Sequence, residues 1–365
     1  MDFSLTEEQQ ELSELARRIL TDRMTLPHLK ERDHSDDWYD AGTWREFAKA
    51  NLLGIAIPEA HGGLGLGLLD LCLVLTEIGR TVAPLPAVWT LVAAAMPIAR
   101  FGTDEQQAVL SQVAAGDVVL TAAFQEYGAT ADDPHVTAAR DGDAWRINGT
   151  KTAVPAMHVA ESVIVSARPG DGERGLFVVP VSASGVSSAR QQSTGQEPLF
   201  EVTFDNAAAA RLGDAEALDW TLARTTIALC AVAAGVADEA VRITANYTTE
   251  RKQFDRAIGT FQAVGQRMAD CFIDKQAIEL TMLQAATHLD EGLDVPAEVA
   301  TAKFWAADGG DRIGRAALHV HGGISIDTDY SIHRYYLWLK QIEFTLGAAT
   351  PQLVTLGKHL ADTPA

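Results

Sequence analysis

The sequence predicts an α+β fold in which a helical domain, a compact β domain and a second helical domain follow one another along the chain. Apolar residues recur at helical spacing through residues 5–115 and again after about residue 215. Between them, short apolar segments alternate with Gly, Asp, Asn and Pro. No internal repeat accompanies this order, so the order itself indicates the architecture. We expect domains at residues 1–117, 118–214 and 215–365.

The N-terminal domain should begin with a capped helix. Thr6 followed by Gln9 has the composition of a helix start, and apolar residues continue from there at helical spacing. A glycine-rich loop is expected at residues 58–65. A further helix, Leu69–Arg80, should end before Pro84, because proline cannot continue a helix.

The middle domain should be a small β-barrel or sandwich. Six short strand-like segments lie at residues 118–124, 136–139, 145–147, 162–165, 175–180 and 200–204. Asp141-Gly142-Asp143 and Asn148-Gly149 have the composition of tight turns between strands. After this domain, long helices are predicted at residues 223–251, 262–289 and 297–320, with a shorter one at 331–340.

Composition and charge exclude several classes of function. The formal net charge of −20 argues against a nucleic-acid partner, because phosphate neutralisation requires clustered Lys and Arg. The longest apolar runs are too short to cross a membrane, and residues 1–8 do not resemble a signal peptide. Cys72, Cys230 and Cys271 lie far apart in apolar helical patterns, without metal-ligand spacing. We therefore expect buried, reduced thiols, no metal site and a cytoplasmic protein.

Five motifs occur in a fixed order along the chain. They are Pro58-Glu59 with its glycine-rich loop, Thr76-Glu77-Ile78-Gly79-Arg80, Trp145-Arg146-Ile147-Asn148-Gly149-Thr150-Lys151, the run from Glu250-Arg251-Lys252-Gln253-Phe254 through Phe261-Gln262 to Met268-Ala269-Asp270, and His319-Val320-His321-Gly322-Gly323. In this order and with this spacing, the chain resembles the acyl-CoA dehydrogenase family over nearly its whole length.

The resemblance implies a fold and a chemistry. The fold would comprise an N-terminal helical domain, a middle β-barrel and a C-terminal four-helix bundle. Family members bind FAD across a subunit interface, and a carboxylate removes the α-proton of an acyl-CoA thioester while the β-hydride passes to the flavin. An electron-transfer flavoprotein is the acceptor that the resemblance implies.

Part of the family's cofactor site is retained. Arg251 matches the arginine that pairs with the diphosphate of the neighbouring subunit's FAD, a role suited to a forked guanidinium. His319 stands where the family usually has glutamine. The residues that the resemblance assigns to cofactor binding are Arg251, Gln253, Phe254, Gln262, His319, Gly322 and Gly323. The alternative for Arg251 is a solvated cation on a helix surface.

The flavin-ring side of the site departs from the family. After Lys151 the family has a Trp-Ile-Thr-Asn stretch whose Trp and Thr contact the ring, and here residues 153–156 read Ala-Val-Pro-Ala. The family's Thr-Glu-Pro and Gly-Ser-Asp segment is replaced by residues 124–132. The aromatic lid and the usual hydroxyl donors are absent from these places.

The catalytic base is also missing from both positions that the family uses. The first position is occupied by Leu346, before Gly347 and Ala348, and the second by Thr225, before Thr226. Leucine and threonine do not accept a proton at neutral pH. No catalytic residue is therefore assigned.

Carboxylates near the Gly-Gly pair are fallback candidates for a base. Asp329 is the first of these, with Asp327 beside it, although a capped turn before the helix at 331–340 accounts for both. Glu343 lies nearer the missing position, but on a different helical face.

Three functional hypotheses follow. The favoured one is the degenerate partner subunit of an actinobacterial α2β2 heterotetrameric acyl-CoA dehydrogenase of the steroid side-chain type. Such a subunit shares FAD with a homologous chain that supplies the base, and residues 321–336 resemble those partner chains in particular. The alternatives are a self-sufficient homotetrameric acyl-CoA dehydrogenase with an unusual base such as Asp329, and a non-catalytic scaffold without flavin. The flavin absorbance of the purified chain separates the three.

Overall fold

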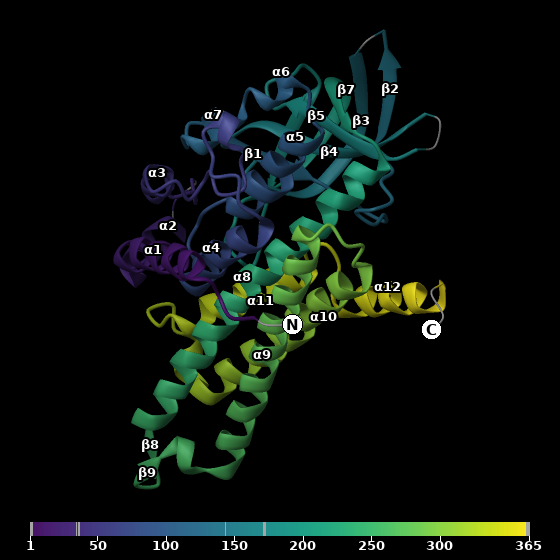
Figure 1. The fold of residues 1–365 in the computed structure, drawn as a ribbon. Helices are drawn as coiled ribbons and strands as arrows, with labels where there is room; N and C mark the ends of the chain where they lie inside the picture. Colours follow the sequence, from purple (N-terminus) through teal and green to yellow (C-terminus); the bar gives the residue numbers. More distant parts are fainter. Residues whose placement is uncertain (1–2, 34, 36, 143, 171–172, 363–365) are drawn as a thin grey trace. The chain divides into compact units, whose positions relative to one another are not determined.

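The computed structural model describes residues 3–33, 35, 37–142, 144–170 and 173–362 (Figure 1). The chain divides into two compact units, each assembled from separate stretches of sequence. The helical unit comprises Met1–Glu31, Cys72–Ala83 and Thr226–Ala365, and the β unit comprises Arg32–Leu71 and Pro84–Thr225. The order of helices, strands and helices confirms the predicted α+β class. The expected boundaries at residues 117/118 and 214/215 remain predictions.

The N-terminal third is helical, as predicted. Its elements are α1 (Glu7–Arg23), α2 (Leu26–Asp33), α3 (Ala41–Lys49), the 3₁₀ helix η1 (Glu59–His61), α4 (Leu68–Arg80), the π-helix η2 (Val88–Ala95), α5 (Met96–Phe101), α6 (Asp104–Gln107) and α7 (Leu110–Ala114). Helix α1 starts with the expected cap, because Gln9 N–H donates to Thr6 Oγ1 at 3.2 Å and Thr6 N–H donates to Gln9 Oε1 at 3.1 Å. Local capping chemistry was therefore a sufficient guide to this helix start.

The strands of the β unit form a closed sheet. They are β1 (Val119–Ala123), β2 (Thr137–Asp141), β3 (Ala144–Pro155), β4 (Ala160–Pro169), β5 (Gly175–Pro180), β6 (Val186–Gln191) and β7 (Leu199–Gly213). The order is β1-β4-β2-β3-β7-β5, β6 pairs with β7, and β5 also pairs with β4, which joins the path into a barrel. Side chains such as Ile147, Val165, Phe177 and Val202 fill its core.

Two details of the β unit differ from the sequence-based expectations. Asn148-Gly149 is not a turn: it lies inside β3, where the pairing with β7 shifts register at Gly149, whose φ is +132°. Strand β6 was not predicted, because its residues are mostly exposed and polar and show no apolar alternation. The other expected turn, Asp141-Gly142-Asp143, does connect β2 to β3. The last residue pair of these two strands is Asp141 with Ala144, and Asp143 lies outside the described residues.

A buried ion pair crosses the interior of the β unit. The Lys151 side chain is fully buried, and its Nζ donates to Glu126 Oε1 at 2.5 Å and to Ser166 Oγ at 2.8 Å. Glu126 also accepts the backbone N–H groups of His135 at 2.9 Å and Val136 at 3.1 Å. Burial lowers the pKa of Lys151 to about 8, and the Glu126 carboxylate opposes that shift. The lysine of the Ile-Asn-Gly-x-Lys motif therefore has a structural role.

The C-terminal part contains long helices joined by a small hairpin. The elements are α8 (Ala215–Glu250), β8 (Lys252–Gln253), β9 (Arg256–Ala257), the 3₁₀ helix η3 (Ile258–Thr260), α9 (Gln262–Asp290), α10 (Pro296–His321), the 3₁₀ helix η4 (Gly322–Ile326), α11 (Ile332–Phe344) and α12 (Ala349–Asp362). Helix α8 begins at Ala215, eight residues earlier than predicted, and the preceding Asp214 accepts Glu216 N–H at its Oδ1. No helix in the described part of the chain has the length and apolar character needed to cross a bilayer.

Close backbone contacts explain one of the glycine-containing motifs. A Cβ on Gly79 of α4 would lie 2.1 Å from the Val232 carbonyl oxygen, and one on Gly235 of α8 would lie 1.8 Å from the Thr76 carbonyl oxygen. Only glycine at both positions lets the two helices approach this closely. Nearby, Glu77 is ion-paired with Arg17 and Arg80. The Thr76–Arg80 motif thus serves helix packing in the helical unit.

The end of α11 is stabilised by a buried lysine. Lys303 of α10 is fully buried, and its Nζ donates to the carbonyl oxygens of Ile342 at 2.7 Å and Glu343 at 3.1 Å. These carbonyls lie in the last turn of α11, where a cation is favoured by the helix dipole. Cys72, Cys230 and Cys271 are buried, as expected.

Candidate functional site

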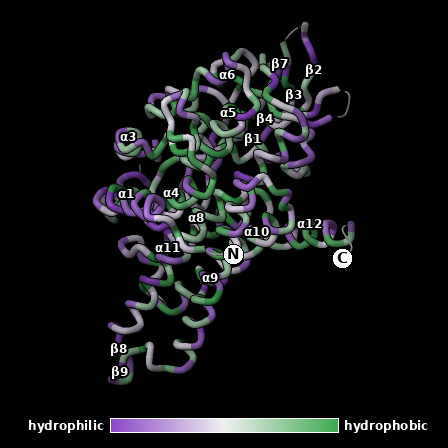
Figure 2. Tube along the Cα trace, viewed as in Figure 1, coloured by the Kyte–Doolittle hydropathy of each residue, from purple (hydrophilic) through white to green (hydrophobic). Residues whose placement is uncertain are grey.

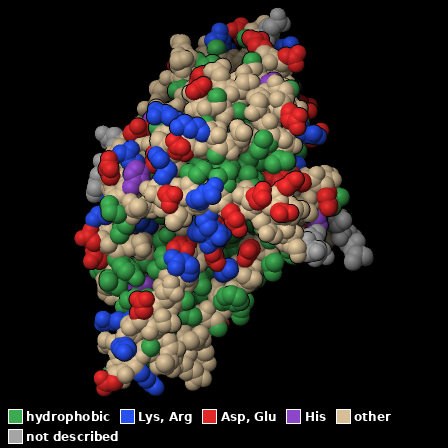
Figure 3. Space-filling view, turned by 60° about the vertical axis from the view of Figure 1, so that its left-hand side comes forward, with side chains coloured by type: hydrophobic (Ala, Val, Ile, Leu, Met, Phe, Trp, Pro, Cys, Tyr) green, Lys and Arg blue, Asp and Glu red, His purple; other side chains and the backbone are tan. Residues whose placement is uncertain are grey.

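One end of the helical unit collects all the residues to which a cofactor role was assigned. Helix α8 ends at Glu250, the β8–β9 hairpin follows, and α9 starts at Gln262. The last turn of α10 carries His319 and leads into Gly322-Gly323. Figure 3 shows Lys and Arg side chains, with some Asp and Glu, in the lowest part of the view, where Figure 1 places the hairpin. The residues Arg251, Gln253, Phe254, Gln262, His319, Gly322 and Gly323 are all exposed.

Cations at this end lack carboxylate partners. Arg251 makes no side-chain ion pair or hydrogen bond to any residue that the structure describes. Arg267, in the second turn of α9, donates from NH1 to His319 Nδ1 at 2.6 Å and has no carboxylate partner among the described residues. Arg256 stacks on the Phe261 ring, 4.1 Å from its centroid. In a chain of net charge −20, cations without a carboxylate partner at one end form a surface that can accept an anion.

Backbone groups at the same end are open to a ligand. Gly322 has a φ of +64°, and a Cβ on Gly322 or Gly323 would meet nothing within 4 Å. The side chain of Phe261, the N-cap residue of α9, makes no capping hydrogen bond. Val264 and Gly265 donate to the Phe261 carbonyl oxygen, whereas the N–H groups of Gln262 and Ala263 have no acceptor among the described residues and remain available. Gln262 is the first residue of α9 and is exposed. These features fit a phosphate-containing group approached by backbone atoms.

The hairpin presents an exposed aromatic side chain on a strained turn. Phe254 and Asp255 connect β8 to β9, with φ values of +52° and +61°. Positive φ at both central residues is the pattern of a type I′ turn, which normally contains Asn-Gly, and it is an outlier for phenylalanine. Phe254 is 87% exposed and touches Phe261 edge-on, at 6.2 Å between ring centroids. Backbone strain of this kind clusters at functional sites in proteins, so it makes Phe254 a candidate for ligand contact.

Relieving the strain at the two turn positions should separate stability from binding. Asp255→Gly and Phe254→Gly should each favour the turn by about 1 kcal/mol, because glycine adopts positive φ without steric cost. Amide hydrogen exchange of residues 251–258 should therefore slow by about fivefold in both variants. Only Phe254→Gly should also weaken the binding of a ligand that this end holds. Equal ligand affinity for both variants would remove Phe254 from the site.

The segment that replaces the family's flavin-ring contacts is held by the chain's own side chains. Gln191 of β6 accepts Ala153 N–H at 2.9 Å, bonds to the Thr152 hydroxyl and donates to the Tyr127 hydroxyl at 3.1 Å. Pro155 is buried, and its carbonyl accepts the Thr121 hydroxyl at 2.5 Å. Ala153 and Pro155 provide neither an aromatic face nor a hydroxyl for a flavin ring. This segment does not fit the ring.

Neither position to which the resemblance assigns a base carries a titratable group. Thr225 is buried, and its hydroxyl donates to the Thr221 carbonyl oxygen at 2.8 Å, within its own helix. Leu346 lies at φ +55° before Gly347 at φ +96°, in a turn that carries no carboxylate at Leu346. Glu343 is ion-paired with Lys340 at 2.5 Å.

Asp329, the fallback base, is poorly suited to proton abstraction. Its side chain is 74% exposed and forms an ion pair with Lys30. The hydrogen bond and the charge of Lys30 lower the pKa of Asp329, which makes the carboxylate a weaker base. Asp327 accepts Asp329 N–H at 2.8 Å and so forms a local turn, whereas the N-cap of α11 is Ser331. The geometry disfavours Asp329 as a catalytic group.

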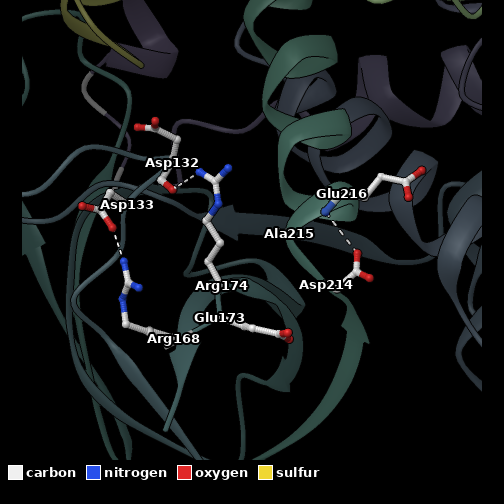
Figure 4. A pocket seen from close by; sticks show the side chains of 8 residues that line it. All are labelled: Asp132, Asp133, Arg168, Glu173, Arg174, Asp214, Ala215 and Glu216. Carbon is white, nitrogen blue, oxygen red and sulfur yellow. Dashed lines mark hydrogen bonds and ion pairs between the residues drawn. The ribbon is translucent and has the colours of Figure 1, made fainter. Parts of the chain in front are cut away.

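The β unit also contains an open hollow of about 590 Å³ (Figure 4). Its lining residues are Asp132, Asp133, Arg168, Glu173, Arg174, Asp214, Ala215 and Glu216. Arg168 is ion-paired with Asp133, and Arg174 donates to the Asp132 carbonyl oxygen at 2.5 Å and to Asp219 at 2.8 Å. Since both arginines already bind the chain's own oxygen atoms, the hollow is poorly suited to an anionic ligand.

Two residues near the β8–β9 hairpin end of the helical unit, Arg267 and Tyr247, were not predicted from the sequence. Arg267 contacts His319 from 52 positions away, and Tyr247 stacks on His321 from 74 positions away, at 4.4 Å between ring centroids. Tyr247 lies four residues before Arg251, which is a weak signal that they share a helical face. Nothing in the local sequence marks Arg267.

Comparison with known proteins identifies similar chains. Residues 6–117 match the acyl-CoA dehydrogenase N-terminal domain, and residues 215–361 match the acyl-CoA dehydrogenase C-terminal domain. The acyl-CoA dehydrogenase FadE27 of Mycobacterium tuberculosis (strain ATCC 25618 / H37Rv) is 38% identical over 377 residues and covers 100% of each chain.

Two solved structures are similar in both sequence and fold. One is a variant of the Tcur3481-Tcur3483 steroid ACAD, with a TM-score of 0.95, 45% identity and 98% of each chain covered. The other is the ChsE4-ChsE5 complex from Mycobacterium tuberculosis, with a TM-score of 0.96, 38% identity and 100% of each chain covered.

Proposed function

Because the chain belongs to the acyl-CoA dehydrogenase family, we propose that it is one subunit of a heteromeric FAD-dependent enzyme of that family. The family oxidises a CH–CH bond of an acyl-CoA thioester. In the proposed complex, this chain contributes the adenosine and diphosphate side of a shared FAD site. A homologous partner subunit contributes the base and the flavin-ring contacts.

The observation that carries this proposal is the contrast between the two halves of the site. Arg251 lacks a carboxylate partner in the described part of the chain, and it lies at the same end as the open Gly322-Gly323 backbone. That end fits the diphosphate and adenosine of FAD. The segment at Ala153 and Pro155 does not fit the flavin ring. If the partner subunit keeps the flavin-ring half of the FAD site, this chain needs to keep only the half that reaches across the subunit interface.

This chain's own residues would bind and orient the cofactor. Arg251 would hold the diphosphate by charge-assisted hydrogen bonds, and Gly322-Gly323 would let the backbone approach the adenosine. Arg267 would add a second positive charge beside His319. FAD, when bound, supplies the hydride acceptor. No group of this chain is assigned a proton-transfer step.

The nature of the complex is inferred from the similar proteins and from exposed apolar surface. Two similar structures are steroid ACAD or ChsE4-ChsE5 assemblies, which supports an unlike partner chain and a steroid side-chain CoA substrate. In the helical unit, α9 exposes Phe272, Ile273 and Leu280, and α12 exposes Leu353 and Leu360. Figure 2 shows hydrophobic segments along α12. Apolar surface of this extent favours association through the C-terminal helices, in a heterotetramer. We further propose that an electron-transfer flavoprotein accepts the electrons from the reduced FAD and that the complex is cytoplasmic.

Purification of the chain alone and with its partner tests the proposal. The chain alone should carry little FAD and show negligible acyl-CoA dehydrogenase activity, because the ring contacts and the base are absent. Coexpression with the homologous subunit, for example from a neighbouring gene, should yield a yellow complex with activity. The self-sufficient alternative requires stoichiometric flavin in the chain alone and activity lost in Asp329→Asn. A scaffold would give no flavin in either preparation.

A further inference from the structure

We propose that His321 is a positioning residue that joins the Arg251 end of α8 to the Gly322-Gly323 turn, so that the two form one rigid cradle for the diphosphate and adenosine of the cofactor. This inference rests on the proposed function and assigns a role to a residue for which the resemblance gave none. His321 is buried beside an exposed glycine pair, and its Nε2 has no hydrogen-bond partner among the described residues.

The His321 ring is enclosed between two tyrosines. His321 is 3% exposed. Its ring stacks on Tyr247 at 4.4 Å and 28°, and it lies at 5.3 Å and 53° from the ring of Tyr330. Nδ1 bonds to the Ala317 carbonyl oxygen at 2.8 Å, which requires the proton on Nδ1. Nε2 is buried and has no partner among the residues that the structure describes. The ring is therefore held in one orientation and in one neutral tautomer.

Tyr247 connects this histidine to Arg251. The Tyr247 hydroxyl donates to the His321 carbonyl oxygen at 3.4 Å. The Tyr247 carbonyl oxygen accepts Arg251 N–H at 2.9 Å, in the last turn of α8. One residue thus bonds to both halves of the proposed cradle. A change in the position of His321 is transmitted to Arg251 through a side chain and a single helical turn.

The glycine turn starts directly from His321. Gly322 N–H donates to the carbonyl oxygens of Leu318 and His319, and the Gly322 carbonyl accepts Ser325 Oγ at 2.7 Å. Gly322 takes a positive φ that other residues rarely adopt, so the direction of the chain after His321 is set by these bonds. The histidine ring anchors one side of this turn in the interior of the unit. Gly322 and Gly323 remain exposed to a ligand on the other side.

The site also predicts a dependence on pH. Burial lowers the pKa of His321, against the weaker opposing effect of the Ala317 carbonyl. The titratable groups that face it are Tyr247 from α8 and Tyr330 from the segment before α11, and Glu250 lies near Tyr330. Protonation would place an N–H donor at Nε2, where the described neighbours offer no acceptor. Because the pKa of His321 is lower in the folded state than in the unfolded chain, where it is about 6.5, the folded state loses stability as the pH falls below about 6.5. The cradle should therefore loosen in acid.

The test is FAD titration into the apo complex with its partner, for wild type and three variants of this chain. His321→Ala should bind FAD about tenfold more weakly at pH 7.5, and Tyr247→Phe should bind FAD measurably more weakly. His321→Phe keeps an aromatic ring that cannot titrate, so it should recover part of the lost affinity. The affinity of the wild type should fall between pH 7 and pH 5.5, and that fall should be smaller in His321→Phe. His135→Gln, an exposed histidine in the β unit, is the matched control.

The outcomes separate this inference from the proposed function. If Arg251→Ala loses FAD affinity while His321→Ala and Tyr247→Phe match the wild type, His321 has no positioning role and the proposed function stands. An identical pH profile in wild type and His321→Phe overturns the role of the histidine in the same way. If Arg251→Ala also retains full affinity, the assignment of a cofactor to this end of the chain fails. Should His321→Ala not assemble, Tyr247→Phe removes a single hydroxyl and still decides the question.

Discussion

Replacing Arg251 by alanine is expected to weaken FAD binding to the assembled complex by at least about tenfold. Within the described residues Arg251 has no ion pair, so its removal should leave the fold and the assembly of this chain intact. The loss would fall on the cofactor, because a charge-assisted contact to a buried partner charge is worth on the order of 2–5 kcal/mol. Each 1.4 kcal/mol or so corresponds to a factor of ten in affinity.

Titration of FAD into the apo complex measures this effect. Arg18→Ala is the matched control, because Arg18 is also exposed, lies on α1 and has no side-chain partner among the residues described. It should bind FAD like the wild type. If Arg251 is only a surface cation, both variants will match the wild type, since an isolated surface charge contributes little. That result would support the scaffold reading, in which the chain has no cofactor role.

Replacing Lys151 by alanine is expected to destabilise the protein by about 3–5 kcal/mol, because it leaves the Glu126 carboxylate buried without its cation. Both side chains are almost fully enclosed, at 0% and 5% exposure. The hydrogen bonds that the Glu126 carboxylate accepts from two backbone N–H groups stabilise its charge only in part. The urea concentration at the midpoint of unfolding should therefore fall, while the slope of the free energy of unfolding against urea concentration should stay unchanged.

A double variant tests whether the unpaired charge is the cause. Lys151→Met with Glu126→Gln removes both charges and keeps an acceptor for the backbone of His135 and Val136. Its stability should lie well above that of Lys151→Ala, since replacing a whole buried ion pair by neutral groups of similar size costs little. Ser166→Ala, which removes only the hydroxyl bonded to Lys151, should have the smallest effect. Equal loss in the single and double variants would instead point to packing around Lys151.

The sequence by itself determined the features that depend on near neighbours in the chain. The start of α1 follows from its capping residue Thr6, and the start of α9 at Gln262 follows from apolar spacing; the structure confirms both. Helix α4 matches its predicted span to within one residue. The prediction that this chain lacks the family's base also follows from the sequence, because Leu346 and Thr225 cannot titrate in any surroundings. Local backbone preference and side-chain chemistry do not require the rest of the fold.

The tertiary structure alone decided which distant residues meet. It places Gly149 in a bulge within β3, pairs the polar strand β6 with β7, and buries Lys151 against Glu126. It also brings Tyr247 to His321 and Arg267 to His319, across 74 and 52 positions of sequence. The sequence next to one residue of such a pair does not indicate which distant residue it will contact. Their meeting depends on how long helices and strands pack, and packing is a property of the whole chain.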